Sequence, residues 1–283
     1  MNTAAPTPQN PLQLREAALS VSHGVATFCH QRPASRNALS MDLRQDYIDL
    51  LDWVQANRGI RALVITGSGG SFCAGADLKA VRERHGSTDP EINSPDAMRR
   101  NLLSIHAWLE RLRTLDIPVV AAVDGPAYGA GFSIALVCDF ILASTRASFC
   151  MAFAKIGLVP DLGAFYLLPR AVGIPKAKEL AMTARRVGVD EALQLGLVHS
   201  VHAPEALLAQ AQAFATRFTA GPREALGMTK SLFNKSYETP YATLAELESQ
   251  AQAVAAATPY HSAAVGAFLR GEPTAFDWDR AAA

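Results

Sequence analysis

Residues 64–78 read VITGSGGSFCAGADL, and residues 121–134 read AAVDGPAYGAGFSI. Each segment begins with a short apolar run typical of a buried strand and continues into a loop rich in glycine and alanine. Each loop then opens an expected helix, whose first turn leaves backbone N–H groups unpaired at the positive end of the helix dipole. Small residues let a ligand atom approach such amides closely, so two loops aimed at one point would form an oxyanion hole.

The same residues allow two other interpretations of these loops. The loops could be tight turns in which small residues serve packing alone, and for either loop taken singly the two readings are equally good. A dinucleotide-binding loop is disfavoured, because Phe72 stands where the third glycine of G-x-G-x-x-G would follow Gly67 and Gly69.

The same order of strand, helix and small-residue loop recurs along the chain. Residues 12–30 alternate around His23-Gly24 as in a hairpin, and apolar spacing from 43 to 54 predicts a helix that Ser40 caps. Short apolar runs at 117–123, 140–144 and 147–151 predict further strands. A polar stretch at 82–96 shows no periodicity and is expected to be a mobile loop, and from about 175 the pattern is almost wholly helical. This alternation predicts an α/β fold with one core.

Composition narrows the class of protein further. The 283 residues are 49% apolar, and 26 Lys and Arg balance 26 Asp and Glu, which argues against a nucleic-acid binder driven by bulk charge. No apolar run reaches the roughly 20 residues that span a bilayer, and the start lacks the features of a signal or transit peptide. We therefore expect no membrane partner and a cytoplasmic location. The four cysteines lack metal-type spacing, and no metal site is expected.

Three segments together carry a family resemblance: SFCAGADLK (71–79), DGPAYGAG (124–131) and KIGLVPDLGAFYLLPRAVG (155–173). They resemble the crotonase superfamily, the enoyl-CoA hydratase/isomerase group, and most of all its phenylacetate-pathway type isomerases. The resemblance implies a crotonase-like spiral of ββα units with a C-terminal helical trimerisation region, in a homotrimer or dimer of trimers. It implies three parts: a disordered tail at 1–11, the spiral core at 12–205 and the helical region at 206–283.

The resemblance also implies chemistry on acyl-CoA thioesters, with no cofactor beyond the CoA moiety of the substrate. By motif position, the amides of Ala76 and Ala130 would bind the enolate oxygen. Residues implied beside the ligand are Arg32, Ala34, Ala74, Asp77, Leu78, Lys79 and Tyr128. Lys230, Lys235 and Arg270 are weaker candidates for the CoA phosphates, and Tyr128, Phe132, Phe153 and Phe165 for an acyl pocket, although ordinary core is the favoured reading for most of these aromatics.

The catalytic carboxylate departs from the usual pattern. Where a resembling hydratase has two glutamates, this chain has Ser133 and Phe153, so hydration by the two-carboxylate route is disfavoured. Asp161 then becomes the leading candidate for the base of a double-bond isomerase, although by sequence it could equally cap the helix that follows. Two alternatives stay open: a hydratase or other family lyase with a non-standard base, and a non-catalytic acyl-CoA-binding protein. Asp139, in VCDF, is expected to be structural.

Overall fold

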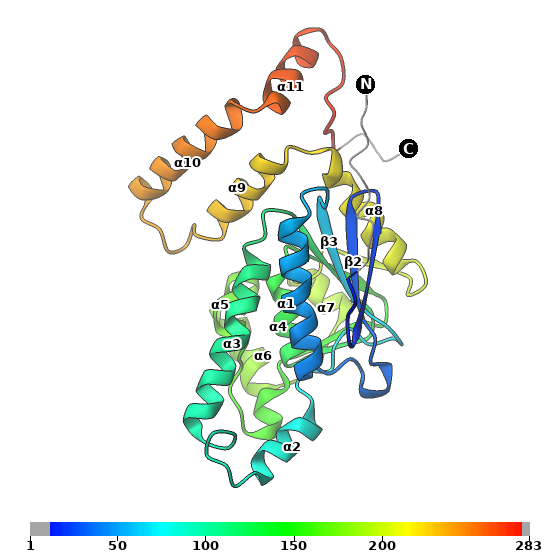
Figure 1. The fold of residues 1–283 in the computed structure, drawn as a ribbon, viewed down its shortest axis with the longest axis vertical. Helices are drawn as coiled ribbons and strands as arrows, with labels where there is room; N and C mark the ends of the chain where they lie inside the picture. Colours follow the sequence, from blue (N-terminus) through cyan, green and yellow to red (C-terminus); the bar gives the residue numbers. More distant parts are fainter. Residues whose placement is uncertain (1–11, 279–283) are drawn as a thin grey trace.

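The structure, a computed structural model, describes residues 12–278. The tail predicted at 1–11 therefore lies outside the described residues. The core is a six-stranded sheet in which the first two strands form the expected hairpin and all other neighbours run parallel (Figure 1). In sheet order its strands are β1 (Ala17–Ser22), β2 (Val25–His30), β3 (Ala62–Gly67), β4 (Val119–Val123), β6 (Phe140–Ser144) and β9 (Ser200–His202).

Helices cover both faces of this sheet. The central strands β3 and β4 are buried along almost their whole length, as expected for a parallel sheet enclosed by helices. On one face lie α1 (Met41–Ala56) and α3 (Pro95–Arg113), where the ring of Tyr47 stacks on Trp108 with centroids 4.6 Å apart. On the other face, α8 (Leu207–Arg217) packs small side chains against the strands. Each fully buried large apolar side chain contributes about 1.5–3 kcal/mol, so this core fixes the strand ends.

A second, smaller sheet carries the helix that follows the second small-residue loop. It contains β5 (Pro126–Tyr128), β7 (Ser148–Cys150) and β8 (Val187–Gly188). The helix α4 (Ala130–Val137) begins directly after β5, and every residue of it except Leu136 is buried, which explains its apolar sequence. The remaining helices of the body are α2 (Leu78–Gly86), α5 (Ala164–Val172), α6 (Ile174–Thr183) and α7 (Val189–Gln194).

Two details of the sequence interpretation were wrong. The polar stretch at 82–96 is not a loop throughout, because α2 continues to Gly86 and α3 begins at Pro95 after a side-chain cap from Ser94. The region after 175 contains two short strands, β8 and β9, and β9 completes the main sheet. Strands of two or three residues are too short to show a period of two, so the sequence pattern does not reveal them.

The last three helices form an arm that projects from the body, here called the C-terminal arm (residues 223–269; Figure 1). It comprises α9 (Arg223–Phe233), α10 (Tyr241–Ala256) and α11 (Pro259–Leu269). Buried Arg223 anchors it, because its guanidinium donates to the carbonyls of Arg58 and Ile60, both at 2.7 Å, and pairs with Asp116 at 2.9 Å. Between residues 12 and 278, no helix combines the length and apolarity needed to cross a membrane.

Candidate active site

The two small-residue loops meet at the carboxyl ends of β3 and β4. Cys73 and Ala127 form an isolated parallel bridge, and the amide of Tyr128 donates to the carbonyl of Cys73 at 2.9 Å. Gly75 lies so close to the second loop that a β-carbon there would be 2.9 Å from the carbonyl oxygen of Tyr128 and 3.7 Å from the amide nitrogen of Ala130. The juxtaposition on which the oxyanion-hole hypothesis depends is therefore present.

Each loop offers a backbone amide at this junction. Ala130 is the first residue of α4 and follows Gly129, whose φ of 50° and ψ of −119° suit a residue without a β-carbon. Its N–H accordingly has no acceptor within the helix. In the other loop, the carbonyl of Gly75 accepts from Leu39 N at 2.8 Å. Among the loop and turn bonds of residues 12–278, none uses the N–H of Ala76 or of Ala130.

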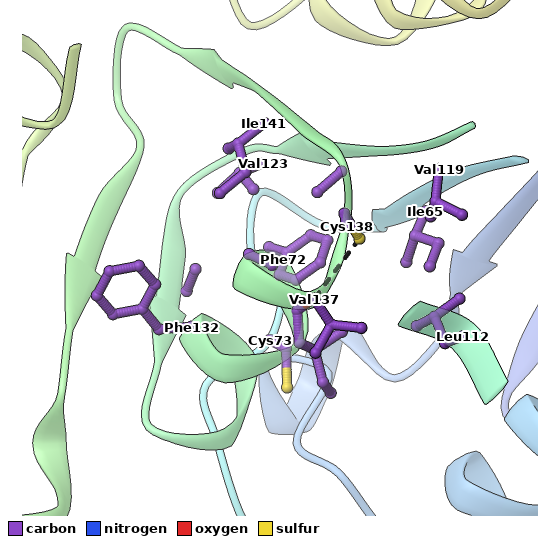
Figure 2. Packing of buried hydrophobic residues seen from close by; sticks show 14 of the residues in the cluster. Ile65, Phe72, Cys73, Leu112, Val119, Val123, Phe132, Val137, Cys138 and Ile141 are labelled. Atoms are coloured by element: carbon purple, nitrogen blue, oxygen red, sulfur yellow. Dashed lines mark hydrogen bonds between the residues drawn. The ribbon is translucent and has the colours of Figure 1, made fainter. Parts of the chain in front are cut away.

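Packing and one buried asparagine hold the first loop in place. Phe72 and Cys73 extend into the same hydrophobic cluster as Val137 of α4 (Figure 2). Asn37 is fully buried and donates from its side-chain amide to the carbonyls of Ser68 and Ser71, at 2.9 and 2.6 Å. It takes a left-handed φ of 55°, a conformation that asparagine tolerates better than most residues. Sequence reasoning missed Asn37, because its partners lie far away along the chain.

A buried histidine supports the same loop from the sheet. His30, at the end of β2, contacts the carbonyl of Phe72 through Nδ1 at 2.9 Å and the hydroxyl of Tyr47 through Nε2 at 2.8 Å. Burial lowers the pKa of His30 to about 4, so the ring is neutral at physiological pH. A neutral imidazole has one donor and one acceptor, and Phe72 O only accepts, so Nδ1 donates to it and Nε2 accepts from Tyr47.

Arg32 and Asp77, both predicted beside the ligand, pair with each other. Arg32 Nη1 lies 3.0 Å from Asp77 Oδ2, and Arg32 Nε lies 2.9 Å from Glu16 Oε1. The other oxygen of Asp77 accepts from Lys79 N at 3.0 Å and caps α2. Burial opposes ionisation of Asp77, but the hydrogen bonds from Arg32 and from the helix start outweigh it and lower its pKa. The pair fixes the exit of the loop that carries Ala76.

The other residues predicted to contact the ligand lie around the same junction or near it. Ala74 donates its amide to Arg36 O at 3.0 Å, and the hydroxyl of Tyr128 lies 3.2 Å from Ser148 Oγ. Leu78 and Lys79 are exposed at the start of α2, and Ala34 is exposed in the short 3-10 turn Pro33–Ser35. Because the side chains of Ala34, Leu78 and Lys79 are exposed, a ligand can approach the first loop from their side.

Asp161 does not cap the helix that follows it. That helix, α5, begins at Ala164, and its N-cap is Gly163, with a φ of 82° and no side-chain cap bond. The intervening Leu162 has a positive φ of 53° and is buried, which turns the chain between Asp161 and the helix. The Oδ1 atom of Asp161 is buried and has no hydrogen-bond partner. The carboxylate of Asp161 therefore does not serve as the helix cap that the sequence allowed.

Ser133 ties Asp161 to the second loop. Its buried hydroxyl donates to the backbone carbonyl of Asp161 at 3.0 Å, and its amide donates to Gly129 O at 3.1 Å. Because Ser133 and Ala130 are three residues apart on α4, they lie on the same face of that helix, one turn from each other. The Asp161 loop is therefore bound to the same helix whose first amide belongs to Ala130.

Burial controls the acidity of Asp161. It raises the pKa of this carboxyl from 3.8 to about 6, and the positive charge of Arg44 partly offsets the rise. The group is therefore mostly ionised at neutral pH yet basic enough to take a proton. Arg44, from the first turn of α1, is a second residue that sequence reasoning missed. A lone arginine on a helix gives no signal of the loop it faces after folding.

Ser133 and Phe153, which stand where a hydratase has its two glutamates, have other roles in this structure. Ser133 supports the Asp161 loop, and Phe153 packs its ring against Gly129, 3.8 Å from where a β-carbon would lie on that glycine.

Asp139 pairs with Lys230 at 2.7 Å and accepts from Val119 N at 2.7 Å, as expected for a structural group. Burial still raises the pKa of Asp139, against the effect of Lys230.

Some weaker candidates are placed elsewhere. Lys230 donates to Asp139, and Arg270 pairs with Glu272 at 2.7 Å, so each of the two has a protein partner in this structure. Phe132 packs on Phe149 in the core with ring centroids 5.2 Å apart, whereas Phe165 is 66% exposed on α5. A cavity of about 210 Å³ lies between α3 and α5 and is bounded by Leu162 and Gly163, next to Asp161. A larger one, of about 490 Å³, lies between α9 and α10, away from both loops.

Comparisons with known proteins agree with this architecture. The sequence model of the enoyl-CoA hydratase/isomerase family matches residues 20–278. The chain is 33% identical to the 1,2-epoxyphenylacetyl-CoA isomerase of Escherichia coli, over 88% of this chain and 93% of that protein. It is 32% identical to a probable enoyl-CoA hydratase of Rhodobacter capsulatus, over 90% and 95%. A solved enoyl-CoA hydratase/isomerase from Cupriavidus metallidurans superposes with a TM-score of 0.88 at 38% identity, covering 94% of this chain and 97% of that one.

A parallel sheet, two small-residue loops that meet at its carboxyl end, and a helical arm define a protein of the crotonase superfamily. Within that superfamily, the chain belongs to the enoyl-CoA hydratase/isomerase family. The family resemblance and the fold expected from it are both confirmed. The protein is accordingly an acyl-CoA enzyme of this family.

Proposed function

We propose that this enzyme moves the double bond of an enoyl-CoA thioester, with Asp161 as the base and the amides of Ala76 and Ala130 as the oxyanion hole. The observation that carries the proposal is the buried, unpaired carboxylate oxygen of Asp161, in a loop whose backbone carbonyl accepts a hydrogen bond from Ser133 of α4. Both glutamate positions of a hydratase lack a carboxylate, so no pair of carboxylates is available there to orient and deprotonate a water.

The reaction needs one carboxylate and two amides. The thioester oxygen of a 3-enoyl-CoA accepts hydrogen bonds from Ala76 N and Ala130 N. Ionised Asp161 removes a proton from the α-carbon, and the electron pair delocalises as a dienolate whose negative charge rests on the thioester oxygen. The start of α4 adds its positive dipole end at that oxygen. Protonated Asp161 then returns the proton to the γ-carbon, which gives the 2-enoyl-CoA and regenerates the carboxylate.

The acidity of Asp161 suits both halves of this cycle. A carboxyl with an ordinary pKa is a weak base toward carbon, whereas burial makes the Asp161 carboxylate a stronger one. No donor within the protein forms a hydrogen bond with the Oδ1 atom of Asp161, so this atom can interact with the substrate. Ser133 and the left-handed turn at Leu162 fix the loop, which limits the reorganisation needed before the proton moves.

The test is the conversion of 3-enoyl-CoA to 2-enoyl-CoA by the wild type and by Asp161→Asn. We expect a loss of kcat of at least about a hundredfold, because a positioned general base contributes about 10²–10⁴. Asp190→Asn, which neutralises an exposed aspartate on α7, is the matched control and should keep full activity. Full activity in Asp161→Asn would remove Asp161 from the mechanism, and efficient hydration of crotonyl-CoA by the wild type would favour a hydratase.

We also propose that the C-terminal arm assembles the enzyme into a trimer or a dimer of trimers. The arm exposes large apolar side chains, with Tyr241, Phe268 and Leu269 each more than three-quarters exposed, at 86%, 77% and 79%. Surfaces of this kind favour association. Light scattering should give three or six times the 30.2 kDa chain mass, and a monomeric mass would contradict the assembly.

A further inference from the structure

Two arginines from different helices meet on one face of α3. Arg44 of α1 donates from Nη1 to Asn101 Oδ1 at 2.8 Å, and Arg84 of α2 contacts Met98 Sδ through Nη1 at 3.0 Å. Met98 and Asn101 are three residues apart, so they lie on neighbouring turns of the same face. Figure 1 shows α2 at the end of the molecule where α3 begins. The two guanidinium groups are therefore neighbours.

Neither guanidinium has a carboxylate partner. Within residues 12–278, no ion pair includes Arg44 or Arg84, although most other arginines have one. The Nε atom of Arg44 is buried without any hydrogen-bond partner. Burial lowers the pKa of Arg44, and the nearby charge of Arg84 adds to this effect, while the carboxylate of Asp161 opposes it only in part. Two like charges, one of them partly desolvated and neither in an ion pair, are costly, so this place favours a further anion that binds both.

This arginine pair also borders the proposed catalytic base. Leu39 pairs with Ala76 of the first loop, and α1 begins two residues later, so Arg44 lies about one turn into a helix that starts beside that loop. The charge of Arg44 also acts on Asp161. They nevertheless form no ion pair, and each keeps a buried atom without a partner. Arg84 lies on α2, which begins two residues after Ala76. Both arginines therefore belong to helices that start at the first loop, and an acyl chain that leaves the Ala76 and Ala130 amides on this side would approach them.

We propose that the acyl group accepted by this site ends in a carboxylate, which Arg44 and Arg84 bind. The substrate class is then the mono-CoA thioester of an unsaturated dicarboxylic acid. This inference rests on the proposed function for the placement of the thioester, but not for the identity of the base. A carboxylate fits the arginine pair better than a neutral group does, because guanidinium donors match carboxylate oxygens in geometry and charge.

Binding of saturated thioesters, which cannot isomerise, tests the inference independently of catalysis. Calorimetry would compare straight-chain acyl-CoAs of four to eight carbons, each with either a terminal methyl or a terminal carboxylate. We expect the carboxylate to bind at least about tenfold more tightly at the best-fitting length, since hydrogen bonds to charged groups are the strong ones. The ratio of the two affinities should fall to about one in the double variant Arg44→Met/Arg84→Met. It should be reduced, but not abolished, in the single variant Arg84→Met.

Arg82→Met is the matched control, because it removes the same charge from an exposed position on the same helix and should leave the preference intact. Equal affinity for both series at every length would overturn the proposal. So would equal binding of a terminal methyl ketone, which is a neutral acceptor, or a uniform loss of affinity for both series in the arginine variants. An inactive enzyme with an intact carboxylate preference would instead refute the isomerase function and leave this site standing.

Discussion

Replacement of Asp161 by asparagine should make the protein more stable at neutral pH while it removes activity. Burial raises the pKa of Asp161 from 3.8 to about 6, so the folded state holds the ionised carboxylate less favourably than the unfolded chain does. A shift of about two pKa units corresponds to about 3 kcal/mol, which is an upper limit because part of the side chain is exposed. Asparagine carries no charge, so it is free of this cost. A helix cap would show the opposite sign.

Urea denaturation at several pH values would measure the difference in unfolding free energy. The advantage of Asp161→Asn should be largest above pH 6, decrease as the pH falls through about 6, and vanish below about 3.8, where both states of the wild type are protonated. Asp77→Asn is the control of opposite sign, because hydrogen bonds lower the pKa of that carboxyl despite its burial. A variant at Asp161 that is less stable at pH 7.5, or a difference independent of pH, would refute this reasoning.

Two further predictions concern the reaction itself. Since the base must be ionised, kcat/KM for the isomerisation should rise with pH through about 6 and be about tenfold lower at pH 5 than at pH 8, and a flat profile would exclude Asp161 as the titrating base. Gly75→Ala should lower kcat about a hundredfold in the same assay, because its β-carbon would meet Tyr128 O at 2.9 Å at a φ of 105° and displace the Ala76 amide. Gly188→Ala, where a β-carbon meets open space, is the control, and equal activity of the two variants would contradict the assigned loop geometry.

Local patterns made much of the fold predictable. The hairpin around His23-Gly24, the strands flanking the loops and the helix capped by Ser40 all follow from short-range periodicity and turn chemistry, and the structure has them where expected. The juxtaposition of the two loops was also predictable, because the carboxyl ends of neighbouring parallel strands lie at one edge of a sheet.

The rest of the site depends on contacts between distant segments. The side chains of Asn37 and His30 reach carbonyls beyond the strand that follows them, and Arg44 approaches Asp161 only after α1 has packed. Whether Asp161 caps a helix was decided by the backbone at Leu162 and Gly163, which delays the helix start. Propensity allowed an earlier start, since aspartate is a good N-cap, and tertiary packing overrode it.

The most direct test is exchange at the α-carbon of the thioester in heavy water, followed by mass spectrometry or NMR. If Asp161 removes the α-proton while Ala76 and Ala130 hold the enolate oxygen, and the protonated carboxyl exchanges with solvent before it returns a proton to the α-carbon, the wild type should incorporate deuterium at this carbon. Asp161→Asn should then do so at least about a hundredfold more slowly. Exchange at the wild-type rate in Asp161→Asn, in a chain that still binds the thioester, would contradict the role assigned to this carboxylate.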